Sequence, residues 1–407
     1  YKIRVIINDS SIPGEGEHKL LNHLINNKNV DDINVIYGLD ADLIMLCIVA
    51  NMPNIYLLRE TVEIDNTIHN DGFEFLYLSI DNLKLNLINE VLDKIGEYYL
   101  NDEKKNAIIN DFIFISFILG NDFIPHSPVC SIRNNGIDKL LEIYGKYYSQ
   151  IKQNLIDIDK KKINHDFFKS IIKDLANEED SSLQKYNNKR KRKSNFHKRY
   201  DNLYEKDKDE LNIYPQLNRS LEIKINQGNK NWRQLYYKYF FYIDNNQDND
   251  NKYEIDIICH NYIESFFWTF HYYFGECKSW NWFYRYPYPP SFYDIYNYLH
   301  NFVSDINNIV IEKNKPPKPF EQLLMVLPPQ SSNLIPQEYY SIIFNSNAKY
   351  LFPYNYELNY VNKYYLWECT PILPYIDINI IRKYTSHIII NKKNKTRNKK
   401  SQIYKNY

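Results

Sequence analysis

Five acidic residues stand in three short segments that favour a chain turn or a close approach: Glu15, Glu17, Asp40, Asp42 and Asp122. A glycine precedes each of Glu15 and Glu17, and glycine lets another group come close to the backbone. The dipole of a following helix accounts for one acid of that pair, and helix capping accounts for one of Asp40 and Asp42. Asp122 follows an apolar helix at a turn marked by a glycine. Taken alone, this pattern favours a solvated turn residue. Each pair therefore leaves one acid free for chemistry.

Metal binding is the chemistry that these five side chains suit. If a sheet brought them to one rim, their charges would repel strongly, and cations would be needed to keep them ionised at neutral pH. Oxygen ligands without a His or Cys cluster point to Mg²⁺ or Mn²⁺ over zinc. Two such ions are the usual arrangement for the attack of water on a phosphodiester. The acids therefore predict a site for two Mg²⁺ or Mn²⁺ ions.

The elements that must position these acids alternate between strand and helix patterns along the first part of the chain. Short apolar runs predict strands at 4–7, 33–39 and 54–58. Helical spacing of apolar residues predicts helices at 15–26, 42–50, about 81–100, 103–119 and 134–151. Such alternation predicts an α/β fold with a parallel sheet covered on both faces. Asp40 then lies beyond the carboxyl end of a strand, where open α/β sheets bind ligands.

The pattern changes after residue 151. Charge runs among Asn and Ser predict a variable, partly disordered insertion at 152–215. A mainly helical, aromatic-rich region follows at 216–390, and 391–407 predicts a basic, frayed tail. Two basic runs, 189–193 and 392–400, favour a solvated loop and tail over a nuclear-localisation or RNA-tethering segment.

Composition limits the class of protein. The 407 residues carry 50 Lys and Arg against 50 Asp and Glu, so bulk positive charge cannot provide nucleic-acid affinity and local patches would have to. Five scattered cysteines form no Cys-x-x-Cys pair, which excludes a zinc ribbon and favours a reducing intracellular compartment. No uninterrupted apolar run is long enough to predict a membrane span.

Several motifs, in this order, resemble those of one family. DSSIPGEGEHK at 9–19, YGLDADLIML at 37–46 and LGNDFIPH at 119–126 are similar to signature segments of the Xrn/Rat family of 5′→3′ exoribonucleases. Later segments resemble further motifs of that family: WNWFYRYPY at 280–288, PFEQLLMVLPP at 319–329 and WECTPILPYID at 367–377. One departure is Pro287, where the family usually has His.

The resemblance implies a fold and an activity. It implies a flap-endonuclease/PIN-like parallel-sheet nuclease core at 1–151 and a second conserved, helical region at 216–390. The five acids would fall on five of the family's seven metal ligands, and the enzyme would hydrolyse single-stranded RNA bearing a 5′-monophosphate by a two-metal mechanism. The other two carboxylates and the 5′-phosphate pocket lie upstream in the family. The sequence opens at Tyr1 in a strand pattern, so we expect a fragment.

Two tryptophans are candidates for a substrate contact. In the family, one Trp of the 280–288 motif stacks on the 5′ nucleotide, and we assign that role to Trp280, with Trp282 as the alternative. Base stacking tolerates any base, which suits an enzyme without sequence preference. The competing interpretation is that both rings are core aromatics.

A second function of another class is compatible with the sequence. A catalytically inert, truncated relative would act as an RNA- or partner-binding module. A flap-type nuclease acting on DNA fits less well, because that class lacks the region with the Trp-containing and Pro-Phe-Glu-Gln motifs.

Overall fold

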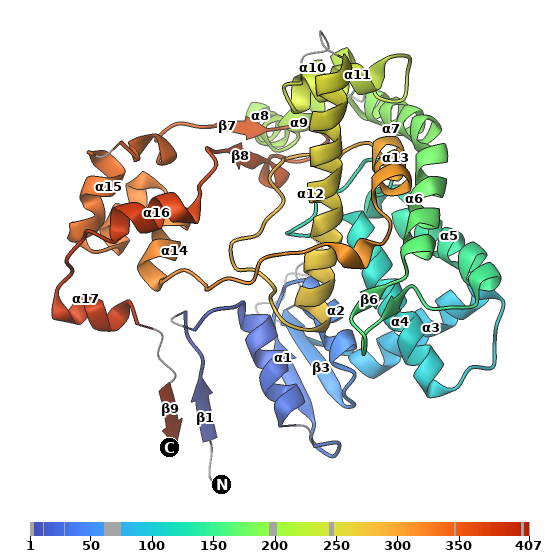
Figure 1. The fold of residues 1–407 in the computed structure, drawn as a ribbon, viewed down its shortest axis with the longest axis horizontal. Helices are drawn as coiled ribbons and strands as arrows, with labels where there is room; N and C mark the ends of the chain where they lie inside the picture. Colours follow the sequence, from blue (N-terminus) through green and yellow to red (C-terminus); the bar gives the residue numbers. More distant parts are fainter. Residues whose placement is uncertain are drawn as a thin grey trace.

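The computed structural model describes most of the chain as a mixed α/β protein in which helices predominate. The described residues are 4–10, 12–27, 29–60, 75–194, 202–243, 248–345, 347–399 and 403–406. Figure 1 shows a large body that holds the sheet and the long helix α12, and a smaller helical unit on the left. The first and last described strands, Arg4–Ile7 and Ile403–Asn406, lie side by side below them.

A three-stranded sheet forms the base of the acidic region. β2 (Asn34–Tyr37) and β3 (Ile55–Glu60) are parallel, and α2 (Asp42–Ala50) connects them. β4 (Phe75–Ser79) joins β3 antiparallel on the other side, so the sheet order is β2-β3-β4. The sequence pattern did not reveal β4. Its antiparallel pairing makes the sheet mixed, and among the described strands β2–β3 is the one parallel pair.

The first predicted strand forms but has a different partner. β1 (Arg4–Ile7) pairs antiparallel with β9 (Ile403–Asn406), so it lies outside the β2-β3-β4 sheet that the alternation of elements predicted for it. Alternating patterns identify strands but carry no information about pairing with a segment almost four hundred residues away. The structure thus supports a mixed α/β fold with small sheets, and the finer assignment of a PIN-like parallel core stays an expectation.

The helices predicted for the first 151 residues are present: α1 (Gly16–Asn26), α2, α3 (Ile80–Ile95), α4 (Asp102–Ser116) and α5 (Gly136–Ile151). Local caps explain where two of them begin. The Ser79 hydroxyl accepts a hydrogen bond from the backbone of α3, and the Asn101 side chain does the same for α4. α4 is buried over most of its last two turns, which fixes the turn that carries Asp122.

The segment 152–215 is more ordered than the charge runs predicted. It contains β5 (Ile156–Asp157), β6 (Lys162–Ile163), α6 (His165–Asn177), α7 (Glu179–Ser194) and α8 (Leu203–Asn212), while 195–201 lies outside the described residues. α6 is strongly amphipathic and buries five apolar side chains: Phe167, Phe168, Ile171, Ile172 and Leu175. Composition averaged over the segment concealed this apolar face, because Lys, Asp and Asn occupy the other side of the helix.

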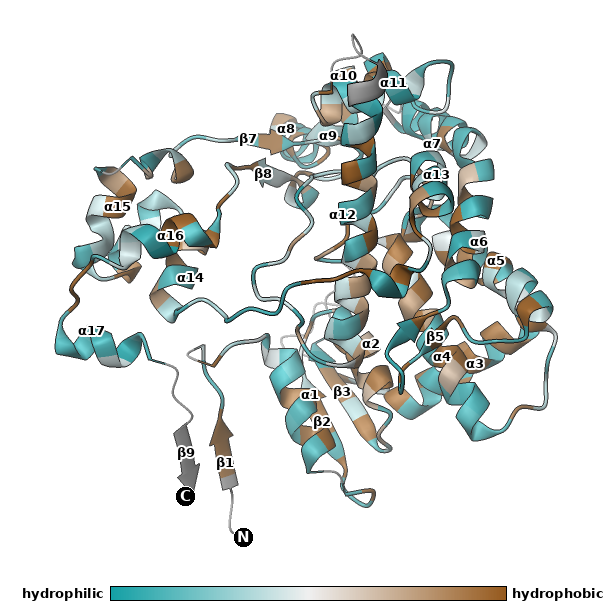
Figure 2. Cartoon of the chain, viewed as in Figure 1, coloured by the Kyte–Doolittle hydropathy of each residue, from teal (hydrophilic) through white to brown (hydrophobic). Residues whose placement is uncertain are grey.

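The aromatic-rich region packs onto the same core as the sheet. It comprises α9 (Tyr214–Leu217), α10 (Ser220–Ile225), α11 (Trp232–Phe240), α12 (Asp248–Phe274) and α13 (Phe292–Phe302). Figure 2 shows apolar segments on β3, α2 and α12, where these elements meet. Phe114 of α4 and Phe270 of α12 illustrate the contact, with ring centroids 5.8 Å apart at a right angle.

The smaller unit has a hydrophobic core of its own. It contains α14 (Pro319–Val326), α15 (Tyr340–Phe344), α16 (Ile378–Thr385) and α17 (Lys392–Arg397), and the hairpin of β7 (Glu357–Asn359) and β8 (Thr370–Ile372) links it to the large body. The predicted frayed tail is ordered in part: the Asn398 side chain accepts a hydrogen bond from the Phe320 backbone at 3.0 Å, whereas 400–402 and 407 lie outside the described residues. No described helix is long and apolar enough to cross a membrane.

Candidate active site

Glu15 opens helix α1 but does not cap it. It occupies the N-cap position in extended backbone geometry, and its side chain makes no capping hydrogen bond. Its carboxylate instead accepts a hydrogen bond from the hydroxyl of Tyr272 on α12. The preceding loop is held by Lys19, whose amino group donates to two loop carbonyls at 3.0 and 3.1 Å. Helix capping therefore does not explain Glu15.

Asp40 and Asp42 lie between β2 and α2. Ala41 is the N-cap of α2, and no side chain makes a capping hydrogen bond there. Asp42 is in the first turn, where its carboxylate accepts a hydrogen bond from the backbone of Leu43, and Asp40 is exposed. Capping therefore does not account for Asp40. Both acids follow the carboxyl end of β2, as the sequence predicted.

Asp122 is held by a specific turn after α4. Gly120 has φ +92°, and a Cβ there would lie 2.6 Å from the Cβ of His126, so a larger residue would disrupt the turn. The Asn121 side-chain oxygen accepts backbone hydrogen bonds from Phe123 and Ile124, both at 2.9 Å. This local hydrogen-bonded turn projects Asp122 to the surface.

The three acidic segments share one electrostatic environment. Burial raises the pKa of Glu15, and the negative charges of Asp42, Glu17 and Asp122 raise it further. Burial likewise raises the pKa of Asp42, and Glu17, Asp122 and Asp40 add to that increase. No lysine or arginine is among the largest influences on either carboxyl. The charges of Glu17 and Asp122 thus act on both Glu15 and Asp42, and that of Asp40 acts on Asp42.

The five side chains do not form a closed coordination cage. Within the part of the chain that the structure describes, no group of three or more His, Cys, Asp or Glu side chains is close enough to hold a metal ion. Their donor chemistry nevertheless suits a hard divalent cation, because all of the candidate ligands are carboxylate oxygens and no basic side chain is among the largest influences on Glu15 or Asp42.

Two tyrosines of α12 lie beside this acidic region. Tyr272 and Tyr273 lie near the end of α12. Burial raises the pKa of Tyr273 above its usual value, and the charges of Asp42, Glu15 and Asp122 raise it further. The ring of His18 lies 4.0 Å from that of Tyr272, and burial lowers the pKa of this histidine to about 4. Tyrosine is so frequent in this chain that no sequence signal distinguished these two.

The two candidate tryptophans have different surroundings. Trp282 is fixed in the aromatic core: its ring stacks on that of Trp268 at 5.5 Å, and its indole nitrogen donates to Glu264 at 3.3 Å. The Trp280 ring instead reaches the loop before Glu15, where its Cη2 lies 3.8 Å from the position that a Cβ on Gly14 would occupy. Trp282 therefore fits the competing core interpretation, while Trp280 lies beside the acidic region.

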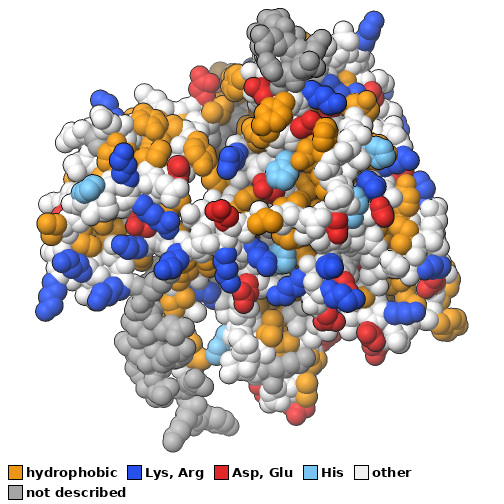
Figure 3. All heavy atoms as spheres, viewed as in Figure 1, with side chains coloured by type: hydrophobic (Ala, Val, Ile, Leu, Met, Phe, Trp, Pro, Cys, Tyr) orange, Lys and Arg blue, Asp and Glu red, His pale blue; other side chains and the backbone are white. Residues whose placement is uncertain are grey.

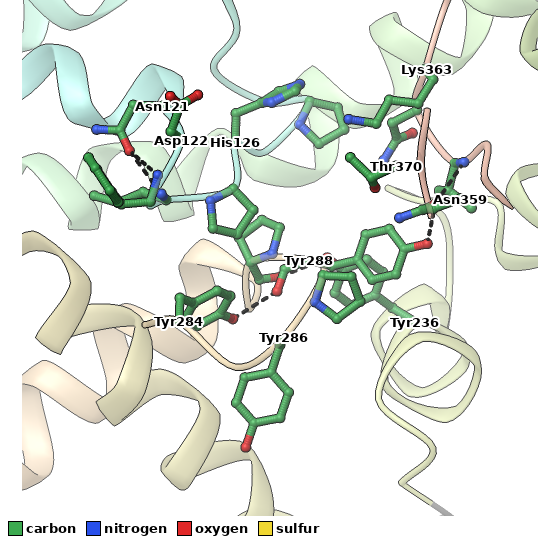
Figure 4. A pocket seen from close by; sticks show the side chains of 18 residues that line it. Asn121, Asp122, His126, Tyr236, Tyr284, Tyr286, Tyr288, Asn359, Lys363 and Thr370 are labelled. Atoms are coloured by element: carbon green, nitrogen blue, oxygen red, sulfur yellow. Dashed lines mark hydrogen bonds between the residues drawn. The ribbon is translucent and has the colours of Figure 1, made fainter. Parts of the chain in front are cut away.

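A cavity of about 280 Å³ begins at Asp122. Figure 4 shows Asn121, Asp122 and His126 on one side of it and Lys363 opposite, with the side chain of Lys363 extending toward the side that carries His126. Tyr288 crosses the floor and donates to Asn359 at 2.7 Å.

Lysines and arginines occur in many places on one face of the molecule. In Figure 3 they are spread across the visible face and do not form one continuous stripe. The basic run at 189–193 belongs to α7, and within it Arg190 is only 2% exposed, donating to Glu222 at 2.6 Å. That arginine serves packing, so the run is not a free basic peptide.

Comparison with known proteins identifies the family. The model described as the Xrn1 helical domain matches residues 102–227 and 217–404, which is more than half of the chain, and the XRN 5′-3′ exonuclease N-terminus matches 1–61. The chain belongs to the Xrn family. The helical-domain match also includes all of 152–215, a segment in which none of the family motifs lies.

Curated Xrn-family relatives extend the comparison. The chain is 26% identical to 5′-3′ exoribonuclease 2 of Arabidopsis thaliana, 27% identical to 5′-3′ exoribonuclease 1 of Homo sapiens and 24% identical to 5′-3′ exoribonuclease 1 of Schizosaccharomyces pombe. Each alignment covers 92% of this chain and, respectively, 47%, 24% and 36% of the relative. The chain thus spans less than half of the length of these Xrn-family relatives.

Proposed function

We propose that this chain is the nuclease-bearing part of a divalent-metal-dependent 5′→3′ exoribonuclease that degrades RNA with a 5′-monophosphate. One observation carries the proposal: after burial, the charges of acids from three separate segments raise the pKa of Glu15 and Asp42, with no basic side chain among the largest influences. The proposal also has the support of the relatives' names and of the family match at residues 1–61.

Each part of the site has a role in this proposal. Glu15, Glu17, Asp40, Asp42 and Asp122 would be the ligands of two Mg²⁺ or Mn²⁺ ions. Such ions, when bound, supply a hydroxide nucleophile and stabilise the leaving oxygen of the phosphodiester. Tyr272 orients the Glu15 carboxylate through its hydrogen bond. Trp280 stacks on a base of the RNA, a contact that tolerates any base.

The test replaces the paired acids of the second segment. D40N/D42N in the whole protein, with Mg²⁺ supplied, is expected to lower nucleotide release from 5′-phosphorylated RNA by at least ~100-fold, because ligands for both ions lose charge. D31N/D32N is the matched control: it removes two exposed carboxylates from the loop before β2 and leaves the rate unchanged. Undiminished release by D40N/D42N would refute the proposal.

A second function rests on a different observation. Because the acids form no closed group among the described side chains, an inert relative that only binds RNA or a protein partner is the alternative. The two differ in one measurement: an inert relative binds 5′-phosphorylated RNA, or a protein, but releases no nucleotide from it at any Mg²⁺ or Mn²⁺ concentration.

The compartment belongs to the proposal as well. We infer a reducing intracellular setting, since all five cysteines are free thiols and Cys47, Cys130 and Cys259 are buried. Detection of the protein in an oxidising compartment would contradict this assignment.

A further inference from the structure

A second cavity continues the one that begins at Asp122. It measures about 420 Å³ and shares four lining residues with the first: His126, Pro128, Asn362 and Lys363. The two cavities therefore form one depression that leads away from the acidic region. We call its far half, lined by Arg133, Lys363, Tyr364 and Trp367, the Trp367 groove.

An exposed aromatic pair lies at this groove. The Trp367 side chain is 73% exposed, which is unusual for so large an apolar ring. Tyr365 lies nearly parallel to it, with ring centroids 6.0 Å apart and an interplanar angle of 8°. The outer face of Trp367 is thus available to a planar ligand, and Tyr365 holds the ring in place from behind.

Cations surround the groove. The Arg133 guanidinium lies 4.9 Å from the Tyr364 ring centroid, and the Lys193 amino group lies 5.0 Å from the same ring. Lys363 lines both cavities. The one carboxylate that lines the groove is Glu368, which accepts a hydrogen bond from Arg133 at 2.5 Å. Two lining cations, Arg133 and Lys363, against one lining anion leave the groove with a positive excess, to which the nearby Lys193 adds.

Buried polar atoms of the groove lack partners. The Tyr364 side chain is only 6% exposed, yet its hydroxyl has no hydrogen-bond partner among the described residues. The same is true of the side-chain oxygen of Asn362, which lines both cavities, and of the side-chain nitrogen of Asn121, next to Asp122. Buried polar groups are normally hydrogen-bonded, so these atoms point to a polar ligand in the depression.

We propose that the Trp367 groove binds single-stranded RNA beside the proposed cleavage site, with a base stacked on Trp367 and phosphates held by Lys363 and Arg133. This inference rests on the proposed function for the identity of the nucleic acid. Stacking on an aromatic face together with cations along the backbone is how proteins bind single strands without sequence preference. A protein ligand would not need the combination of an exposed flat ring, a cationic excess and scattered hydrogen-bonding atoms.

Substitution of the exposed ring tests the stacking contact. In EDTA, W367A is expected to weaken binding of a fluorescent dodecanucleotide RNA with a 5′-hydroxyl by about tenfold, whereas W367F retains most of the affinity because it keeps an aromatic face. Y99A is the matched control, since Tyr99 is fully exposed and remote from the groove. Equal affinities of W367A and the wild type would overturn the proposal and favour a protein as the ligand of the groove.

Substitution of the lysine tests the phosphate contact. K363A is expected to reduce the slope of log affinity against log salt by about 0.7, the value for one phosphate contact on a single strand. K160A, which removes a lysine on the surface near β5, keeps the wild-type slope. An unchanged slope in K363A would contradict the phosphate contact.

The assay conditions separate this inference from the proposed function. Because these assays contain EDTA and use RNA with a 5′-hydroxyl, they measure the groove whether or not the chain hydrolyses RNA. Conversely, D40N/D42N can fail to abolish cleavage while W367A still weakens binding.

Discussion

Two sets of acidic residues in this protein have opposite surroundings. Asp111 on α4 is fully buried, and its carboxylate accepts four hydrogen bonds, at 2.8–2.9 Å, from Tyr144, Asn154 and the backbones of Leu155 and Ile156. Glu15 and the other acids of the candidate site are at least partly exposed. Burial raises the pKa of Glu15 and Asp42, and the charges of other acids of the site raise it further.

Glu179 belongs with Asp111. It is 1% exposed, it pairs with Arg233 at 2.8 Å, and it accepts backbone hydrogen bonds from Phe292 and Tyr293 at the start of α13. The buried carboxylates of Asp111 and Glu179, which stabilise the fold, thus have hydrogen-bond partners within the protein. The acids of the candidate site receive few such partners, which is expected of groups whose partner is a ligand.

The largest expected effect comes from removing a partnered acid. D111A leaves two backbone N–H groups, an amide and a tyrosine hydroxyl buried without an acceptor, so we expect a loss of about 3 kcal/mol or more in the free energy of unfolding. Urea denaturation measures it. D93A, at an exposed site on α3, is the control and is expected to stay within about 0.5 kcal/mol of wild type. Similar losses in both would show that Asp111 is not a structural anchor.

The same residue predicts a pH dependence of stability. Burial raises the pKa of Asp111 from 3.8 to about 7, so the folded state binds a proton that the unfolded chain releases. This stabilisation is fully present below pH 3.8 and is lost as the pH rises toward 7. D111N, which cannot titrate, is expected to remove up to about 1.4 kcal/mol per pH unit from the slope in that window. Parallel wild-type and D111N curves would contradict the raised pKa.

The smallest expected effect comes from an acid of the candidate site. Because burial and the like charges of neighbouring acids raise the pKa of Asp42, D42N is expected to increase the free energy of unfolding by about 0.5 kcal/mol in EDTA. Added Mg²⁺ is expected to raise the thermal midpoint of the wild type more than that of D42N. D31N, in the loop before β2, responds to Mg²⁺ like the wild type. A loss of stability in D42N would show that Asp42 is a structural residue like Asp111.

The sequence was sufficient to predict the acids and the helices that carry them, because motifs and helical periodicity depend on residues close together in the chain. Helix α1 begins one residue after the predicted start, α2 has the predicted bounds, and α3 and α4 begin within one residue of the prediction. The prediction that Glu15, Asp40 and Asp122 would come together depended on a sheet. In the structure the charges of Asp42 and Asp122 act on Glu15, while the role of these acids as metal ligands stays a proposal.

Contacts between distant segments were beyond the sequence. Nothing local indicates that Tyr272 hydrogen-bonds to Glu15, that β1 pairs with β9, or that the buried Asp111 differs from any other helical aspartate. Each depends on long-range packing, which periodicity does not encode. The prediction for 152–215 erred for a related reason: charge runs describe the outward face of α6 and α7, whereas apolar residues on the inward faces decide whether they fold.

The single helix α12 contacts two segments that lie far apart in the sequence, around Pro125 and Glu15. Tyr262, midway along it, donates to the carbonyl oxygen of Pro125 at 3.3 Å, and Tyr272, near its end, donates to Glu15. One residue inserted between these tyrosines would turn everything beyond it by about 100° around the helix axis, moving Tyr272 away from Glu15 while hardly changing the helical content. Surface loops tolerate changes in length, but the spacing along this helix does not, so its length should be among the least variable features of related chains.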